Sequence, residues 1–162
     1  MLKKLSKFLF PISLAIIIMS TPSDAKAGNH EKTLGIGGGF CTYNHAGYGK
    51  MFFQYSFIPL VRIAPEIGYV FPHNNISGFE ASVDVQFPFR IVGGFKFYPL
   101  AGITMNNWSY KESPRVTRAG FDVGGGFDLY FTSSLKMSIQ SKYSFVKETK
   151  GVYLDLGIGY VF

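Results

Sequence analysis

The chain has 162 residues, enough for one domain, and 16 basic against 10 acidic side chains give it a net charge of +6. Hydrophobic residues make up 47% of it and aromatic residues 17%, which excludes an intrinsically disordered protein. The single cysteine, Cys41, excludes a disulfide scaffold, and the one long apolar run is too short for a polytopic helical membrane protein.

Residues 1–27 have the features of a secretory signal peptide. Lys3, Lys4 and Lys7 give the segment a basic start. The apolar stretch Phe8–Met19 follows, and Ala25–Ala27 supplies a small-residue cleavage site. A membrane anchor is the alternative, but the apolar stretch is shorter than the ~20 residues of a spanning helix. Cleavage would leave residues 28–162 with 12 of the 16 basic and 9 of the 10 acidic side chains, in no basic cluster. Nucleic-acid binding is therefore not expected.

Eight segments of residues 28–162 alternate apolar and polar side chains with a period of two, which predicts β-strands with two different faces. In chain order they are 33–41, 50–58, 61–71, 79–87, 95–105, 118–131, 135–145 and 152–162. Most have the ~9–11 residues that a tilted strand needs to cross a bilayer. The pattern predicts an all-β fold, an eight-stranded antiparallel up-and-down transmembrane β-barrel, preceded by the cleaved signal peptide.

The polar faces of these segments carry a balanced set of charges. The six cationic residues are Lys50, Arg62, Lys96, Arg118, Lys136 and Lys142, and the six anionic residues are Glu66, Glu80, Asp84, Asp122, Asp128 and Asp155. Charges removed from water must be paired, so we expect a sealed, charge-paired interior. The alternative is a solvated face whose balance is accidental. Phe52, Tyr98 and Leu100 interrupt the polar pattern, and mid-strand Pro65 and Pro99 predict bulges or register slips.

The connections alternate in length along the chain, which predicts the orientation. Segments 59–60, 88–94 and 132–134 are the shorter, periplasmic ones, and 42–49, 72–78, 106–117 and 146–151 are the polar, external ones. The longest is the candidate surface contact loop, with Trp108, Tyr110, Lys111 and Arg115 as its contact residues. The alternative is an ordinary interfacial aromatic residue among solvated charges.

The last segment places Leu154, Leu156, Ile158, Tyr160 and the terminal Phe162 on one face. This run resembles the C-terminal assembly signal of bacterial outer-membrane β-barrels. The chain as a whole, including 62–69 and 98–102, resembles the small eight-stranded class of the OmpA transmembrane domain, OmpX and the opacity-type proteins. The resemblance implies a Gram-negative outer-membrane location and recognition of the C-terminal strand by the barrel assembly machinery.

Motifs for catalysis or cofactor binding are weak. Gly35–Gly39 lacks the Gly-Lys-Ser/Thr ending of a phosphate loop, and the three histidines lack metal-ligand spacing. His73, Ser77 and Glu80 lie near one another in sequence without matching a known hydrolase motif. We therefore predict no catalytic, cofactor-binding or metal-binding residue, and Cys41 is expected to be an inert buried thiol.

These patterns predict a monomeric outer-membrane barrel with a structural or surface-interaction role. Its expected partners are outer-membrane lipid, the assembly machinery and an unidentified extracellular ligand. Three alternatives stay open. They are a narrow pore, a periplasmic lipocalin-like barrel whose bulky faces turn inward around a small apolar ligand, and an enzyme that would lose activity on Ser77→Ala.

Overall fold

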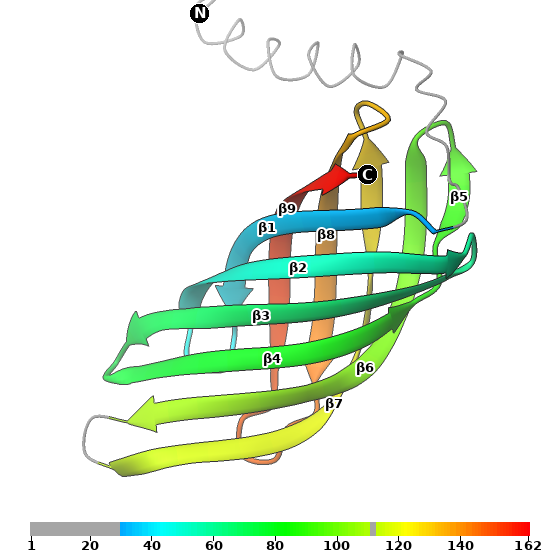
Figure 1. The fold of residues 1–162 in the computed structure, drawn as a ribbon. Coiled ribbons are helices and arrows are strands. Elements are labelled where there is room, and N and C mark those ends of the chain that lie inside the picture. Colours follow the sequence, from blue (N-terminus) through cyan, green and yellow to red (C-terminus); the bar gives the residue numbers. More distant parts are fainter. Residues whose placement is uncertain (1–29, 111–112) are drawn as a thin grey trace, which may run out of the picture.

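The computed structural model describes residues 30–110 and 113–162, so the expected signal peptide at 1–27 lies outside the described residues. This part of the chain is all-β (Figure 1). The strands are β1 (Lys32–Cys41), β2 (Ala46–Ile58), β3 (Val61–His73), β4 (Ile76–Gln86), β5 (Phe89–Val92), β6 (Phe95–Tyr110), β7 (Ser113–Tyr130), β8 (Leu135–Ser144) and β9 (Gly151–Val161).

The strands form one closed antiparallel barrel. Sequential neighbours pair from β1 to β4 and from β6 to β9, while β1–β9 and β4–β6 pairing closes the wall. The short β5 continues the pairing of β4 along β6, because Gln86 pairs with Leu100 and Phe89 with Phe97. Strands β4 and β5 thus act as one wall strand interrupted at Phe87 and Pro88, and the predicted eight-stranded barrel is confirmed.

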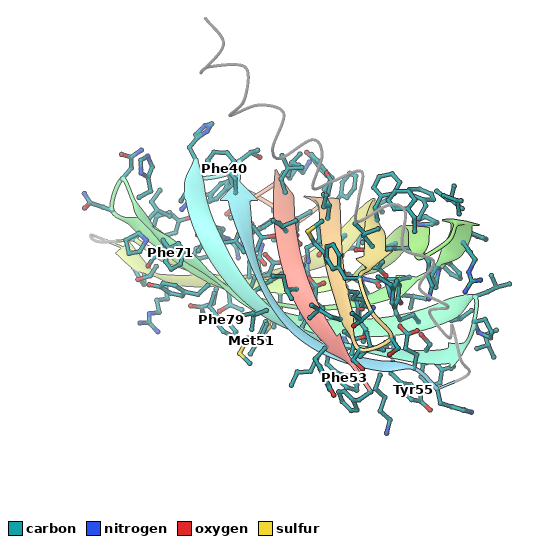
Figure 2. The ribbon with its side chains drawn as sticks, turned by 90° about the horizontal axis from the view of Figure 1, so that it is seen from above. Phe40, Met51, Phe53, Tyr55, Phe71 and Phe79 are labelled. Atoms are coloured by element: carbon teal, nitrogen blue, oxygen red, sulfur yellow. The ribbon has the colours of Figure 1, made fainter. Side chains whose placement is uncertain are left out.

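Alternation along each strand separates an apolar outer wall from a polar interior. Met51, Phe71 and Phe79 lie on the outer side of the wall (Figure 2) and are 51%, 53% and 44% exposed. Their inward neighbours, such as Lys50 and Glu80, are buried. No helix within 30–110 and 113–162 is long and apolar enough to span a membrane. The apolar side chains therefore cover the outer face of the wall, and the charged ones face the interior.

At the barrel end opposite the termini, strands β3, β4, β6 and β7 are longer than the sequence pattern predicted. Strand β6 runs to Tyr110 and β7 begins at Ser113, so most of the expected 106–117 loop is a β-hairpin. A two-residue turn also joins β3 to β4, where Asn74 and Asn75 take the positive φ values of 50° and 63° that tight hairpins require. The prediction of long polar connections here is wrong, because polar side chains in these segments belong to inward faces or strand ends.

The prolines do not shift the strand register. Pro65 pairs in register with Val83 on β4, although pairing with β2 is interrupted beside it. Pro99 pairs in register with Gly125, and its carbonyl accepts a hydrogen bond from Phe87 where β4 and β5 separate. The prediction of bulges at these two positions is wrong. Proline has no N–H to donate, but each proline lies where pairing with one neighbouring strand is interrupted, so the strand continues without a bulge. The irregularities lie at strand ends, including Ser56/Ile58 and Trp108/Tyr110.

Candidate functional site

The interior gathers nearly all the charges that sequence alternation assigned to it. Eleven of the twelve are buried, whereas the Arg118 side chain is 40% exposed near the barrel end. Glu31 was missed and is 9% exposed inside the barrel. Extending the alternation of β1 back by one inward position, from Thr33, would have found it. Among the described residues the interior therefore holds five cationic and seven anionic side chains, not six of each.

The interior layer nearest the two termini is centred on Glu31. Its carboxylate accepts a 2.6 Å hydrogen bond from the Tyr130 hydroxyl and lies 3.6 Å from the ammonium groups of both Lys96 and Lys136. The Lys96 ammonium also lies 4.3 Å from the centre of the Tyr130 ring. Lys136 reaches Asp128 at 3.7 Å, which connects this layer to the next.

The second layer is built around the pair of Arg62 and Asp128. One Arg62 nitrogen lies 2.6 Å from Asp128, and Ser138 donates a second 2.6 Å hydrogen bond to the same carboxylate. The Arg62 Nε donates to Gln86 at 2.7 Å, and its guanidinium lies 4.8 Å from the Tyr98 ring centre. All of these groups are buried, so the pair is fixed from several strands at once.

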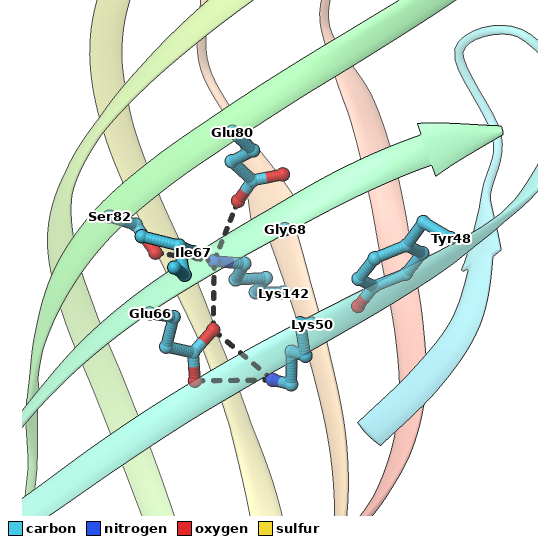
Figure 3. Close-up of a pocket in the computed structure, with 8 residues that line it drawn as sticks. All are labelled: Tyr48, Lys50, Glu66, Ile67, Gly68, Glu80, Ser82 and Lys142. Atoms are coloured by element: carbon cyan, nitrogen blue, oxygen red, sulfur yellow. Dashed lines mark hydrogen bonds and ion pairs between the residues drawn. The ribbon is translucent and has the colours of Figure 1, made fainter. Parts of the chain in front are cut away.

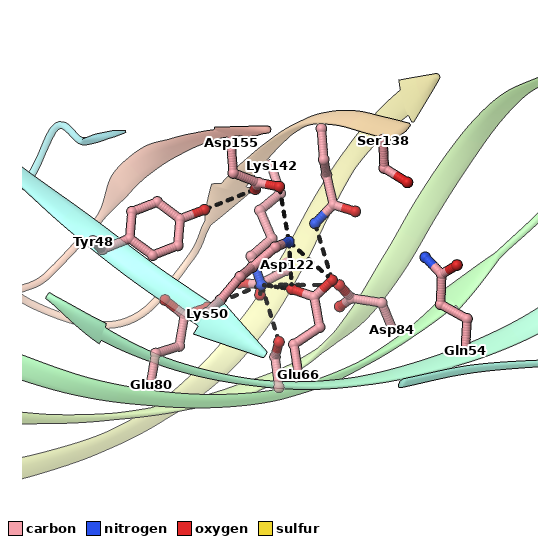
Figure 4. A network of polar contacts seen from close by, with 12 residues as sticks. Tyr48, Lys50, Gln54, Glu66, Glu80, Asp84, Asp122, Ser138, Lys142 and Asp155 are labelled. Carbon is pink, nitrogen blue, oxygen red and sulfur yellow. Dashed lines mark hydrogen bonds and ion pairs between the residues drawn. The ribbon is translucent and has the colours of Figure 1, made fainter. Parts of the chain in front are cut away.

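The third layer joins two lysines through Glu66 (Figure 4). Lys50 donates to both Glu66 oxygens at 3.1 Å and lies 2.9 Å from Asp155. Asp155 accepts a 2.7 Å hydrogen bond from the Tyr48 hydroxyl. Lys142 lies 3.4 Å from Glu66 on the other side. Glu66 thus bridges the two ammonium groups.

Lys142 is the point where the excess of carboxylates concentrates, and Figure 3 shows Glu66, Glu80 and Ser82 around its ammonium group. Its ammonium lies 2.9 Å from Glu80, 3.1 Å from Asp122, 3.4 Å from Glu66 and 3.9 Å from Asp84. It also donates to Ser82 at 3.0 Å, so five oxygen-bearing groups surround three N–H donors. The adjoining cavity measures only about 10 Å³, roughly the space for one water molecule.

An apolar cluster fills the interior beyond this layer, toward the turns opposite the termini. Its buried side chains are Cys41, Ala46, Tyr48, Val70, Trp108 and Tyr153. The partly buried Tyr43, Ile76 and Tyr110 pack against them. Trp108 is 1% exposed, so its prediction as a surface contact residue is wrong. It occupies an inward position of β6, and Gly78 on β4 leaves the space for its ring.

The remaining residues of the predicted contact loop are dispersed. Tyr110 is partly buried and its hydroxyl lies 2.9 Å from that of Tyr43, whereas Arg115 is exposed on β7. Burial and this hydrogen bond raise the pKa of Tyr43, in the β1–β2 turn, to about 12. Lys111 lies outside the described residues. The loop therefore does not present its four predicted residues together.

Arg118 pairs at the barrel end with the β8–β9 connection. Its guanidinium donates a 2.9 Å hydrogen bond to Glu148, and this bond lowers the pKa of the exposed Glu148 carboxyl. The prediction of Arg118 as an interior charge is wrong, because β7 continues past the end of the interior network.

Comparisons with known proteins give matches in structure. No protein-family model matches the sequence, and no curated protein matches it significantly. The N-terminal barrel domain of Pseudomonas aeruginosa OprF aligns with a TM-score of 0.70 and 22% identity over 83% of this chain and 98% of that one. The Yersinia pestis attachment invasion locus protein Ail gives 0.57 and 19%, over 83% and 100%. Neisserial surface protein A gives 0.63 and 12%, over 83% and 98%.

The chain has the fold of the small eight-stranded outer-membrane β-barrels. This confirms the class that the sequence resembled, and the apolar outer wall agrees with the predicted outer-membrane location. The lipocalin-like alternative is wrong, because the bulky apolar faces point outward and the interior is filled by ion pairs.

Other residues singled out in the sequence occupy separate places on the outer-membrane barrel fold. The C-terminal run lies in one outward line along β9 and the residue that follows it. Its five side chains are 49–60% exposed: Leu154, Leu156, Ile158, Tyr160 and Phe162. Ser77 lines a hollow on the outer wall, whereas Glu80 points into the interior, so they do not combine with His73 as a triad would require. Within the described residues no three His, Cys, Asp or Glu side chains are arranged to hold a metal ion.

Proposed function

We propose that this chain is a monomeric, non-conducting outer-membrane barrel with a structural or surface-interaction role. The observation that supports this is the filling of the interior along its length. Ion pairs link Glu31 to Arg62 by way of Lys136 and Asp128. Hydrogen bonds through Gln86 and Gln140 continue from Arg62 to Glu66. Glu66 pairs with Lys142, and the apolar cluster around Trp108 fills the interior beyond it. A path for ions would require several of these contacts to separate together.

The charges themselves support a structural role for the interior. Breaking a buried ion pair by removal of one partner costs about 3–5 kcal/mol, because the remaining charge stays in a poorly hydrated environment. Most of these pairs join two different strands of the wall, as Arg62 on β3 does with Asp128 on β7. The network therefore ties opposite sides of the barrel together.

Single-channel recording of residues 28–162 refolded into a planar bilayer tests the sealed interior. We expect no stable conductance steps from protein whose folding is established by altered gel migration before boiling. Reproducible steps from such protein would refute the sealed barrel and support the narrow pore. Seven carboxylates against five cations in the interior favour a cation-selective pore in that case.

We propose further that the C-terminal strand engages the barrel assembly machinery through its outward face. Phe162→Ser is expected to lower the amount of folded protein in the outer-membrane fraction while leaving refolding into liposomes unchanged. Phe71→Ser is the matched control, since Phe71 and Phe162 are 53% and 60% exposed on the same outer wall. Equal loss of folded protein in cells for both variants would contradict a specific signal.

We also propose that the chain is not an enzyme, on the separation of His73, Ser77 and Glu80. Ser77→Ala is expected to leave the acyl-chain composition of outer-membrane lipids unchanged, measured by mass spectrometry in cells that produce the protein. A change that follows Ser77→Ala but not Ser109→Ala, on the neighbouring strand, would contradict this.

A further inference from the structure

A polar hollow lies on the outer wall, at the barrel end away from the termini. It measures about 120 Å³ and is lined by Tyr69, Ser77, Gly78, Phe79, Asn107, Ser109 and Arg115. Arg115 is exposed, and no acidic side chain within 30–110 and 113–162 forms an ion pair with it. Asn107 donates a 2.7 Å hydrogen bond to Thr117 beside it. The hollow therefore offers a cation and several hydrogen-bonding groups at the edge of an apolar surface.

An apolar hollow of about 530 Å³ lies on the same outer wall across β3, β4, β6 and β7. Small residues, Ala81, Ala119 and Gly120, lie among its lining, and Ile103 and Met105 are 69% and 48% exposed beside them. Because these side chains are short, the surface is depressed between the larger side chains around them. The result is a groove on a surface that elsewhere carries large apolar side chains.

Strand register places the two hollows next to each other. Ala81, Met105 and Ala119 form one outward cross-strand row, and Phe79, Asn107 and Thr117 form the next. Successive outward rows are separated by two residues, about 7 Å along the strands. The polar groups thus lie next to the apolar groove, one row closer to the barrel end away from the termini.

A second apolar hollow adjoins the same polar site. It measures about 360 Å³, shares Tyr69 and Phe79 with the polar hollow, and shares Ile67 with the first groove. Phe79 projects from the outer wall in Figure 2. One polar hollow therefore adjoins two apolar hollows, and the Ile67 side chain lies between the two apolar ones.

We propose that this part of the wall binds one lipid with a net-negative, phosphate-bearing headgroup. Arg115 pairs with the phosphate, Asn107 and Ser109 supply hydrogen-bonding groups, and the two acyl chains lie in the apolar hollows. The charge and the shape favour a lipid over a second copy of the chain, because Arg115 needs an anion at the edge of the apolar grooves. The inference depends on the proposed membrane embedding and adds a specific lipid to it.

Native mass spectrometry of the detergent-solubilised barrel tests the site with two probes, phosphatidylglycerol and phosphatidylcholine with identical acyl chains. We expect one phosphatidylglycerol to be retained in preference to phosphatidylcholine. Arg115→Gln is expected to reduce that preference about fivefold, the effect of one basic residue at a membrane surface. Lys147→Gln, the same charge change on an exposed connection, is the control and should keep the preference.

A second variant separates the groove from the charge. Ala119→Phe fills the larger apolar hollow and is expected to weaken retention of both lipids. Equal retention of both lipids by wild type and all variants would overturn the site and indicate ordinary boundary lipid. A dimer that Ala119→Phe abolishes would also overturn it and assign the groove to a second copy. Gel migration before boiling, measured on each sample, shows whether a failure instead lies in barrel folding.

Discussion

At the scale of single residues, Lys142 is the interior cation with the most carboxylates around it. Four carboxylates lie within 3.9 Å of its ammonium, and its side chain is only 2% exposed. Its hydrogen-bonding capacity is smaller than the number of acceptors around it. Removing this one charge would leave the carboxylates facing one another in a poorly hydrated space.

We therefore expect Lys142→Met to lower the free energy of unfolding by about 3–5 kcal/mol. The measurement is urea unfolding in liposomes, followed by the fraction that migrates as folded barrel. Lys147→Met, an exposed lysine in the next connection, should change stability by less than about 0.5 kcal/mol. Adding Asp122→Asn to Lys142→Met should restore part of the loss. Equal effects of the two lysine variants would contradict the central role of Lys142.

At the scale of elements, the pairing of β4 with β6 depends on a small residue opposite a large one. Gly78 pairs directly with Trp108, and a Cβ at Gly78 would lie 2.6 Å from the indole ring. The other two nearest atoms also belong to that ring, so the obstacle is the indole alone. Trp108 is the single tryptophan of the chain, which makes its fluorescence a local reporter.

Gly78→Ala is expected to displace the Trp108 ring, shift its fluorescence emission and lower stability by about 1–3 kcal/mol. In the Trp108→Leu background the same Gly78→Ala change should cost much less, because the clashing ring is gone. Urea unfolding of the four proteins gives the coupling energy. A coupling energy near zero would show that Gly78 is required by the backbone and not by the indole.

At the scale of the whole molecule, pairing of β1 with β9 and of β4 with β6 closes the wall into a barrel, and the outward side chains are apolar. Such a barrel satisfies its backbone hydrogen bonds without water, as membrane spanning requires. In water the outer wall would instead be a continuous exposed apolar surface.

Residues 28–162 are therefore expected to fold only with detergent or lipid and to migrate differently on a denaturing gel before and after boiling. In cells the protein should remain with membranes after spheroplast lysis. Release into the soluble fraction without detergent would contradict the membrane barrel. A cytosolic or periplasmic marker protein in the same lysate serves as the control.

Alternation with a period of two predicted the eight wall strands and their two faces, because it separates outward from inward side chains directly, but it missed the extensions of β6 and β7. It identified eleven buried charges correctly for the same reason. The partners of these charges follow from the barrel's three-dimensional arrangement, since Arg62 and Asp128, 66 positions apart, meet across the barrel. That arrangement also placed Trp108 inside, because a polar segment does not reveal whether the strands continue through it. The lipid site likewise depends on register, which brings Ser77, Asn107 and Arg115 together from three strands.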